Sequence, residues 1–282
     1  MDKSIRQMQI REFLKDKMLR IFMLVLVILS VFPFIYMFII SIMDTMSMRL
    51  TWDVLKNTTY TLENYKKLFF NGGHFGRYIL NSTIITLYIV VVAVVVSSMA
   101  AYVFAKKRFV GSAFVYRLYV ATMMIPSQAI LIPLFIIIKD LGLLNTYTGI
   151  ALPLYYAYGV VMLRSFVKNI PTELFEAADL DGCGEFRKFM AVVIPLMKPA
   201  LISLAIYFFF NVWGNLIWPM LVASNDKMTI TQAVASMQSG IALTHYGSMM
   251  AATTVAFLPP FILYLLMQKQ FVEGIAVSGL KG

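Results

Sequence analysis

The chain has 282 residues, of which 60% are hydrophobic and 13% are charged, whereas an ordinary soluble domain has about 25% charged residues. This composition indicates one polytopic membrane domain and leaves no room for a second soluble domain of normal size. The formal net charge of +10 does not indicate a nucleic-acid-binding protein, because the basic residues lie at the edges of hydrophobic segments, and the one cysteine, Cys183, excludes internal disulfides and a cysteine-rich metal site.

Six hydrophobic segments are long enough to cross about 30 Å of hydrocarbon as helices. They lie at residues 19–43, 79–105, 112–138, 148–167, 200–222 and 248–268. We therefore expect an all-α polytopic membrane protein with six transmembrane helices in a domain at residues 19–268, flanked by a basic tail at residues 1–18 and a second tail at residues 269–282. Because no small-residue cleavage site follows the basic tail, the first segment is expected to be a retained span and not a signal peptide.

The distribution of Lys and Arg predicts that both termini are cytoplasmic. With this orientation most of the 24 basic residues lie on the cytoplasmic side, among them Lys106, Lys107 and Arg108 after the second segment. The same orientation places the long polar connection between the fourth and fifth segments, residues 168–199, in the cytoplasm.

This polar connection is expected to contain a short helix followed by a second helix at residues 185–193. Pro171 can occupy the first turn of the short helix, and acidic residues in its N-terminal half are favoured by the helix dipole. Gly182 is expected to end the helix with a positive φ angle. The surface offered to a partner would consist of two small residues and two hydrophobic anchors, Ala177, Ala178, Phe175 and Leu180.

The run Glu-Ala-Ala-Asp-Leu-Asp-Gly from Glu176 to Gly182, with Pro195 beyond it, resembles the EAA loop of bacterial binding-protein-dependent ABC importers. In that family the loop belongs to a permease subunit and is driven by a separate ATPase. The resemblance implies that ATP and Mg are used by the partner ATPase and that this chain binds no cofactor or metal. It assigns the ATPase contact to Phe175, Glu176, Ala177, Ala178, Asp179, Leu180, Asp181 and Gly182.

Further motifs resemble the second permease of maltose-type carbohydrate importers. They are Ile125-Pro126, Ile132-Pro133, the run from Gly142 to Thr146, the run from Trp213 to Pro219 and the chain ending from Gln268. The resemblance implies the type I importer permease fold, with its core at about residues 75–268, in the bacterial cytoplasmic membrane. It also implies a second homologous permease, two ATP-binding subunits and an extracytoplasmic solute-binding protein as partners, and a sugar or oligosaccharide as the cargo.

Polar and aromatic residues of the fifth segment are candidates for lining the transport path. Tyr207, Asn211, Asn215 and Trp218 recur at helical spacing, so they would share one face of a continuous helix. The alternative is a helix–helix contact held by Asn hydrogen bonds, with Trp218 at the membrane interface. Two further candidates of the same kind are Asn81 and Gln128.

Several motifs are absent from the sequence. There is no Gly-x-x-x-x-Gly-Lys-Ser/Thr loop and no hydrolase signature, so the chain is expected to be non-catalytic. No acidic residue lies near the centre of a span, which argues against a proton-coupled carrier. Gly214 stands where the resembled family often has an acidic or larger residue, so the substrate contacts stay open. The alternatives are a permease for a glycerol phosphate diester, a polyol or a charged sugar, and a self-sufficient secondary transporter or channel with a regulatory loop.

Overall fold

The computed structural model describes residues 2–47, 49, 51–70, 74–224, 226–239 and 245–279, and among these it describes side chains except at 2–14, 238–239 and 270–279. The described residues form helices and connecting turns, with one isolated antiparallel bridge between Met43 and Tyr60. The chain divides into two compact units, Met1–Gly73 with Met237–Val255, and His74–Ser236 with Ala256–Gly282.

The first unit contains α1 (Asp2–Ser41), α2 (Trp52–Asn57), α3 (Glu63–Phe69) and the beginning of α15 (Tyr246–Gly279). Asn64 of α3 is buried, and its amide donates hydrogen bonds to the carbonyl oxygens of Ser41 and Met43 at 3.0 and 2.9 Å. The hydroxyl of Ser248 donates to the Asn64 amide oxygen at 3.0 Å, which joins the end of α1 to the first turn of α15. A single buried amide therefore satisfies backbone groups where two helices meet a loop.

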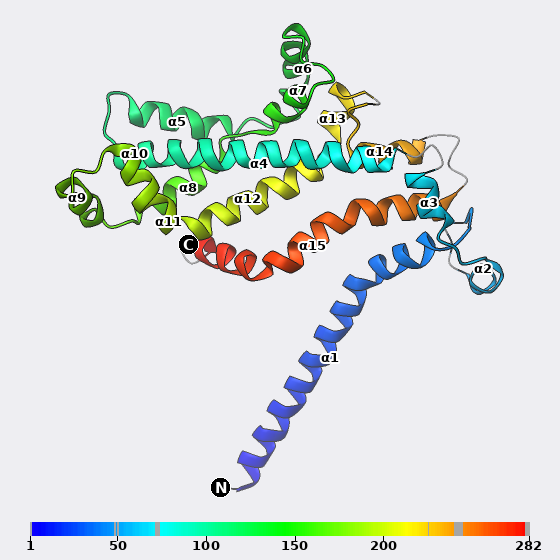
Figure 1. The fold of residues 1–282 in the computed structure, drawn as a ribbon. Coiled ribbons are helices and arrows are strands. Elements are labelled where there is room, and N and C mark those ends of the chain that lie inside the picture. The colour runs from blue at the N-terminus through cyan, green and yellow to red at the C-terminus, as the bar shows by residue number, and fades with distance from the viewer. Residues whose placement is uncertain are drawn as a thin grey trace. The chain divides into compact units, whose positions relative to one another are not determined.

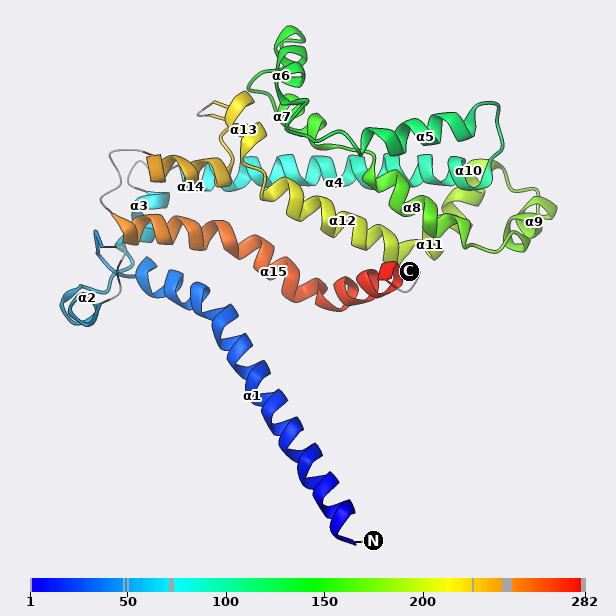
Figure 2. The ribbon, with the colours of Figure 1, turned by 180° about the vertical axis from the view of Figure 1, so that it is seen from behind.

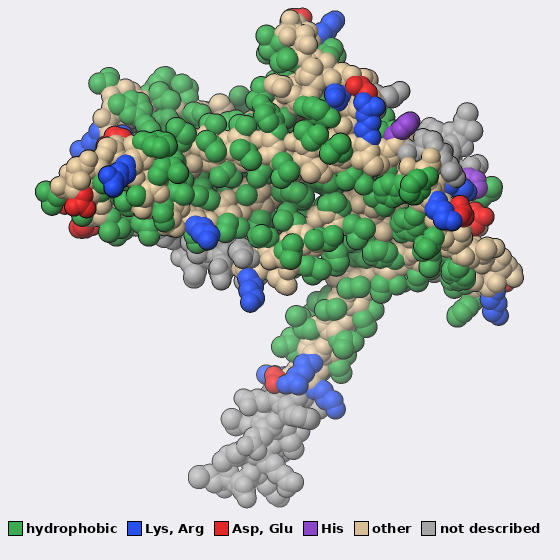
Figure 3. All heavy atoms as spheres, viewed as in Figure 1, with side chains coloured by type: hydrophobic (Ala, Val, Ile, Leu, Met, Phe, Trp, Pro, Cys, Tyr) green, Lys and Arg blue, Asp and Glu red, His purple; other side chains and the backbone are tan. Residues whose placement is uncertain are grey.

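The exposed part of α1 has the surface of a lipid-facing helix. Leu24 and Leu29 are 60% and 64% exposed, and in Figure 3 hydrophobic side chains cover much of the helix above a group of basic and acidic side chains. Water would not favour such a surface, whereas hydrocarbon would, because it solvates apolar side chains while the helix satisfies its own backbone.

The second unit is built around α4 (Phe75–Lys106). It also contains α5 (Ser112–Thr122), α6 (Leu131–Asp140), α7 (Tyr147–Ala151), η1 (Leu152–Leu154), α8 (Tyr158–Lys168), α9 (Glu173–Leu180), α10 (Glu185–Lys188), the π-helical η2 (Phe189–Val193), α11 (Ile194–Leu196), α12 (Lys198–Trp213), α13 (Ile217–Val222) and most of α14 (Ile230–Ser239). Figures 1 and 2 show α8 and α12 running beside α4, with α9 and α10 at one end of α4 and α13 and α14 at the other.

The core of this unit lies where α4, α8 and α12 meet. Ile89, Leu163 and Leu204 from the three helices are fully buried there. Gly159 permits the close approach of α8 to α4, because a Cβ atom at this position would lie 2.3 Å from the Ser97 hydroxyl oxygen.

Two of the expected spans, 112–138 and 200–222, are interrupted. The segment expected to span at 112–138 is not one helix: α5 ends at Thr122, α6 begins at Leu131, and turns connect them. Pro126, which lies between α5 and α6, lacks the N–H group and would clash with the preceding turn of a continuous helix, whereas Pro133 lies in the first turn of α6, where proline is tolerated. Similarly, Pro219 lies in the first turn of α13, where proline is tolerated, and α12 has already ended at Trp213.

Within the described residues, three helices are long and apolar enough to cross a membrane: Lys15–Ser41, Phe75–Lys106 and Tyr246–Lys269. Two bent pairs raise the number to five if each pair is one span. They are Tyr147–Leu154 with Tyr158–Lys168, which meet at 50°, and Glu185–Leu196 with Lys198–Trp213, which meet at 78°. The chain is therefore an all-helical membrane protein with three to five candidate spans by length and composition.

The expected tails are not separate from the outer helices. Helix α1 already begins at Asp2, within the expected tail at residues 1–18, and α15 continues past residue 268 to Gly279. Residues 280–282 of the second expected tail lie outside the described residues. Helix α1 extends into the first tail because residues 2–18 contain neither a proline nor a glycine that would stop it, whereas α15 runs through Gly274 and ends at Gly279.

Candidate coupling site and transport cavity

Helix α9 is the short helix expected in the polar connection. It runs from Glu173 to Leu180, with Thr172 at its N-cap position, so Pro171 precedes the helix instead of occupying its first turn. Gly182 has a φ of 70°, as expected, and its N–H donates to the Asp179 carbonyl at 3.0 Å. The Cys183 N–H donates to the Ala178 carbonyl at 2.9 Å, so a left-handed glycine turn ends the helix.

The two faces of α9 have different surroundings. Phe175 and Ala178 are buried against the chain itself, and the Phe175 ring stacks on that of Tyr102 in α4 with centroids 6.1 Å apart. The Lys106 ammonium lies 5.0 Å from the Phe175 ring centroid. The expectation that Phe175 is offered to a partner is therefore wrong: it anchors α9 to α4, because burial against Tyr102 removes its apolar area from water.

The opposite face of α9 is open. Leu180 is 91% exposed, and Glu176, Ala177 and Asp181 are exposed as well. Figure 3 shows acidic side chains gathered at the end of the molecule where Figure 1 places α9. This face combines a hydrophobic anchor, a small residue and negative charge, which suits docking of a separate protein surface.

A buried lysine fixes α9 to α10. Lys188 is 5% exposed, and its ammonium forms ion pairs with Asp179 of α9 and with Glu185 at 2.9 Å. Asp179 is therefore engaged within the chain. Glu185 in turn accepts a hydrogen bond from the Tyr102 hydroxyl at 2.8 Å and pairs with the Lys107 ammonium at 2.6 Å.

Sequence reasoning missed this cluster of Tyr102, Lys107, Glu185 and Lys188. The spacing of Glu185 and Lys188 on one helical turn could have indicated their pairing. No comparable signal exists for Tyr102, because it lies 83 residues from Glu185 in the sequence and only the packing of α4 beside α10 brings the two together.

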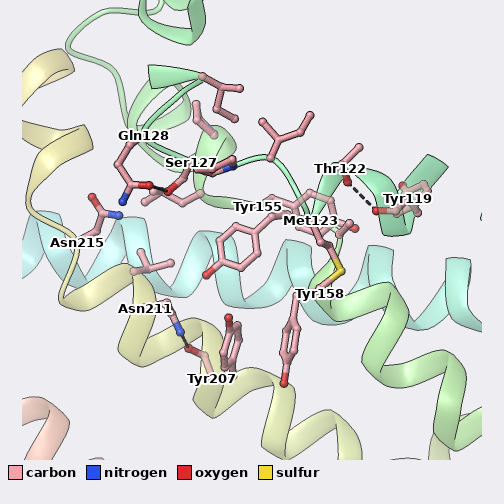
Figure 4. A pocket seen from close by; sticks show the side chains of 18 of the residues that line it. Tyr119, Thr122, Met123, Ser127, Gln128, Tyr155, Tyr158, Tyr207, Asn211 and Asn215 are labelled. Atoms are coloured by element: carbon pink, nitrogen blue, oxygen red, sulfur yellow. Dashed lines mark hydrogen bonds between the residues drawn. The ribbon is translucent and has the colours of Figure 1, made fainter. Parts of the chain in front are cut away.

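A cavity of about 1030 Å³ opens in the same unit between α5, the turns at 123–130, the segment at 153–158 and α12. Its polar lining consists of tyrosines, hydroxyl residues and amides, Tyr119, Thr122, Ser127, Gln128, Tyr155, Tyr156, Tyr158, Tyr207, Asn211 and Asn215. Figure 4 shows the labelled members of this set around the opening. None of the described residues that line the cavity is Asp, Glu, Lys, Arg or His.

Four of the six path candidates line this cavity, namely Gln128, Tyr207, Asn211 and Asn215. The Asn211 amide donates to the Tyr207 carbonyl at 2.8 Å, and the Tyr207 ring lies 4.2 Å from that of Tyr158 between centroids. The break after Trp213 changes the expected single face, because Asn215 lies between α12 and α13 and its Oδ1 accepts from the Trp218 N–H at 3.2 Å.

Trp218 and Asn81 lie away from the cavity lining. Trp218 is 3% exposed, and its indole N–H is directed at the carbonyl oxygens of Gly149 and Ile150, at 3.3 and 3.1 Å. Trp218 packs inside the chain. It therefore lies neither on the cavity lining nor at an exposed membrane interface, the two places expected for it. The helix break rotates it away from the face that carries Tyr207.

Asn81 belongs to a polar network at the other end of α4 from α9. Its amide donates to the carbonyl oxygens of Asp226 and Met228 at 3.1 and 3.0 Å, and its Oδ1 accepts from the Tyr147 hydroxyl at 2.8 Å. The Asn145 amide donates to the Asp226 carboxylate at 2.6 Å, and this bond holds the pKa of Asp226 below its ordinary value, chiefly because it favours the charged form.

Three tyrosines of the cavity lining were not identified from the sequence. Tyr155, Tyr156 and Tyr158 lie within four residues of one another after Pro153, in the bend between η1 and α8. Such a cluster of amphipathic aromatic residues at a proline-marked bend was the signal that could have identified them, since side chains at a bend do not share one helical face.

Comparison with known proteins gives a consistent result. The family described as "Binding-protein-dependent transport system inner membrane component" matches residues 93–277. The arabinooligosaccharides transport system permease protein AraQ of Halalkalibacterium halodurans is 35% identical over 231 residues, which cover 80% of this chain and 81% of that protein. The lactose transport system permease protein LacG of Rhizobium radiobacter is 35% identical over 89% of this chain and 91% of its own length.

Two further comparisons bear on cargo and fold. The sn-glycerol-3-phosphate transport system permease protein UgpE of Brucella melitensis is 31% identical, with 88% of this chain and 92% of that protein covered. Among solved structures, a crystal structure of a bacterial ABC transporter involved in the import of the acidic polysaccharide alginate contains a chain that matches with a TM-score of 0.79. That match covers 94% of this chain and 98% of the other at 23% identity, so it shows a shared fold.

Proposed function

Because this chain belongs to the binding-protein-dependent transport system inner membrane components, as a non-catalytic, multi-pass permease subunit of a bacterial ABC transporter, we propose that it imports an uncharged sugar or oligosaccharide. Membership of this family entails an ATPase and a solute-binding protein as partners. The finer composition that we propose is two ATP-binding subunits and a second, homologous permease that completes the transport path with this chain.

The observation that carries the carbohydrate assignment is the lining of the cavity. Tyrosine rings such as those of Tyr158 and Tyr207 can pack against the C–H faces of sugar rings. Amides such as those of Gln128 and Asn211 can donate to and accept from sugar hydroxyls, because an amide carries both kinds of group. A volume of about 1030 Å³ is also ample for a short oligosaccharide, since drug-sized ligands occupy pockets of about 300–1,000 Å³.

The second candidate cargo is a glycerol phosphate, favoured by the similarity to an sn-glycerol-3-phosphate permease. A phosphate is recognised best by Arg or Lys, through charge-assisted hydrogen bonds. The described cavity lining contains neither residue, and it holds uncharged donors throughout. This composition supports a neutral cargo over a phosphorylated one. The names of the two sugar permeases among the relatives point the same way.

The topology that we propose has six crossings with both termini in the cytoplasm. Three long helices and two bent pairs supply five of them, and the interrupted pair α5 and α6 supplies the sixth. In this orientation the Lys and Arg residues near α9, such as Lys106, Lys107 and Lys188, lie on the cytoplasmic side. The exposed face of α9 would then meet the ATPase.

The test of the cargo is competitive uptake by the complete transporter in vesicles. Labelled arabino-oligosaccharides, lactose and sn-glycerol-3-phosphate are offered separately, with ATP inside and the solute-binding protein outside. Unlabelled sn-glycerol-3-phosphate is then added as the competitor for each sugar. We expect uptake of at least one sugar that the phosphate ester does not inhibit. Uptake of the phosphate ester alone would contradict the carbohydrate assignment while leaving the permease assignment intact.

A further inference from the structure

Helix α4 connects the two polar clusters of the second unit, and each cluster holds a different segment of the chain. Its 32 residues span about 48 Å at the ordinary rise of an α-helix. No proline lies inside it, in contrast to α1 and α15, so no proline kink is expected in α4. A helix of this kind moves as one piece.

The first cluster holds the coupling helix to one end of α4. The Tyr102 hydroxyl and the Lys107 ammonium both bind Glu185 of α10, and Lys188 joins Glu185 to Asp179 of α9. The Phe175 ring stacks on Tyr102, and the Lys106 ammonium donates to the Ile170 carbonyl at 2.6 Å, just before α9. Aromatic packing and charge-assisted hydrogen bonds thus act on the same short helix.

The second cluster holds the segment at 226–230 to the opposite end of α4. The Ser82 hydroxyl oxygen accepts from the Ile230 N–H at 2.8 Å, where α14 begins. The Asn81 amide binds the carbonyl oxygens of Asp226 and Met228. Both side chains are buried, Asn81 at 1% and Ser82 at 3% exposure, so these bonds are shielded from competition by water.

We propose that α4 is the rod that transmits movement of the coupling helix α9 to the outer segment at 226–230, with Tyr102 and Lys188 as positioning residues at the inner end and Ser82 at the outer end. The proposal rests on the proposed contact of α9 with the ATPase. A displacement of α9 would also move Glu185 and Tyr102, because ion pairs and stacked rings connect α9, α10 and α4 directly. The outer segment follows because its backbone is bonded to α4.

Two conservative variants test the rod at its two ends. Tyr102→Phe removes only the hydroxyl that binds Glu185, and Ser82→Ala removes only the acceptor for the Ile230 N–H. Thr83→Ala is the control for Ser82→Ala, because the Thr83 hydroxyl binds the Ile79 carbonyl of the same helix. Lys198→Met is the control for a third variant, Lys188→Met, because Lys198 is an exposed lysine at the beginning of α12.

The readout is the stimulation of ATP hydrolysis by the solute-binding protein, measured on the complete transporter in vesicles. Tyr102→Phe, Ser82→Ala and Lys188→Met should each lower the stimulation about fivefold or more, with basal hydrolysis and bound ATPase unchanged. The two controls should stay within about twofold of the parent. If Lys188→Met fails to assemble, the two hydroxyl variants decide the outcome.

Parental stimulation in Tyr102→Phe and in Ser82→Ala would overturn the proposal. Loss of stimulation in Thr83→Ala to the same extent as in Ser82→Ala would overturn it as well, because the bond to the outer segment would then not matter. A transporter that responds to its solute-binding protein but imports no sugar would refute the proposed cargo alone, since the stimulation is measured without reference to the identity of the solute.

Discussion

At the scale of single residues, Gly182 matters through its backbone conformation and Trp218 through the packing of its side chain. Gly182 ends α9 with a φ of 70° and has open space where a Cβ atom would lie, so a side chain there meets only a conformational cost. Trp218 is the reverse case, because its backbone is ordinary helix and its indole ring is buried with a bonded N–H. The two positions therefore predict different consequences of substitution.

Gly182→Ala should weaken coupling without a steric clash. An L-residue in the left-handed region costs about 1–2 kcal/mol, which disfavours the turn that ends α9. We expect lower uptake per ATP hydrolysed and normal insertion into the membrane. Gly184→Ala is the matched control, because Gly184 also has open space around it but has a φ of −66°. Equal effects of the two substitutions would show that the left-handed turn is not what matters.

Trp218→Phe should destabilise the protein and leave its choice of cargo unchanged. The change removes the N–H that binds the carbonyl oxygens of Gly149 and Ile150, at a cost of about 1 kcal/mol for a hydrogen bond within a membrane protein. Thermal unfolding in detergent measures the loss, and competitive uptake measures the cargo preference. Trp52→Phe is the control, because Trp52 is 78% exposed and should tolerate the change. A shifted cargo preference in Trp218→Phe would show that Trp218 does contribute to the transport path.

At the scale of elements, the two faces of α9 differ, one being buried against the chain and the other exposed. Phe175 and Ala178 attach it to the rest of the chain, while Glu176 and Leu180 remain exposed. Sequence reasoning treated the whole motif as a partner surface. The structure divides it, because a helix of only eight residues needs a buried face to be held in one orientation.

Glu176→Lys should prevent productive contact with the ATPase. The substitution replaces an attraction to a cationic partner surface, of about 1–3 kcal/mol for a charge-assisted contact, with repulsion. Glu176→Gln should have an intermediate effect, because it removes the charge without reversing it. Co-purification of the ATPase and uptake into vesicles check both variants. Parental uptake in Glu176→Lys would show that the exposed face of α9 is not the coupling surface.

At the scale of the whole molecule, the described cavity is open and its lining comes from a single chain. The chain has one short helix, α9, of the kind that we propose for coupling, and its sequence has no nucleotide-binding loop of the Gly-x-x-x-x-Gly-Lys-Ser/Thr kind. The transport function that we propose therefore needs a second permease to close the path and an external source of energy.

The isolated chain should insert into membranes yet transport nothing. Vesicles that contain this chain alone are expected to show no uptake in the presence of ATP, and vesicles that contain the complete transporter should accumulate the solute. The isolated chain should also fail to respond to a proton or sodium gradient. Accumulation driven by such a gradient would support a self-sufficient carrier and contradict the proposed assembly.

The sequence by itself determined the membrane location, the helical class and the position of the short helix α9. These properties depend on local composition and spacing: long hydrophobic runs, the Lys and Arg distribution and the motif that ends at Gly182. Only the tertiary structure decided which residues face the cavity, because breaks at Pro126 and after Trp213 change the direction of side chains that share a helical period. It also decided that Lys188 and Tyr102 hold α9, since their partners lie on other elements and no local pattern in the chain records such contacts.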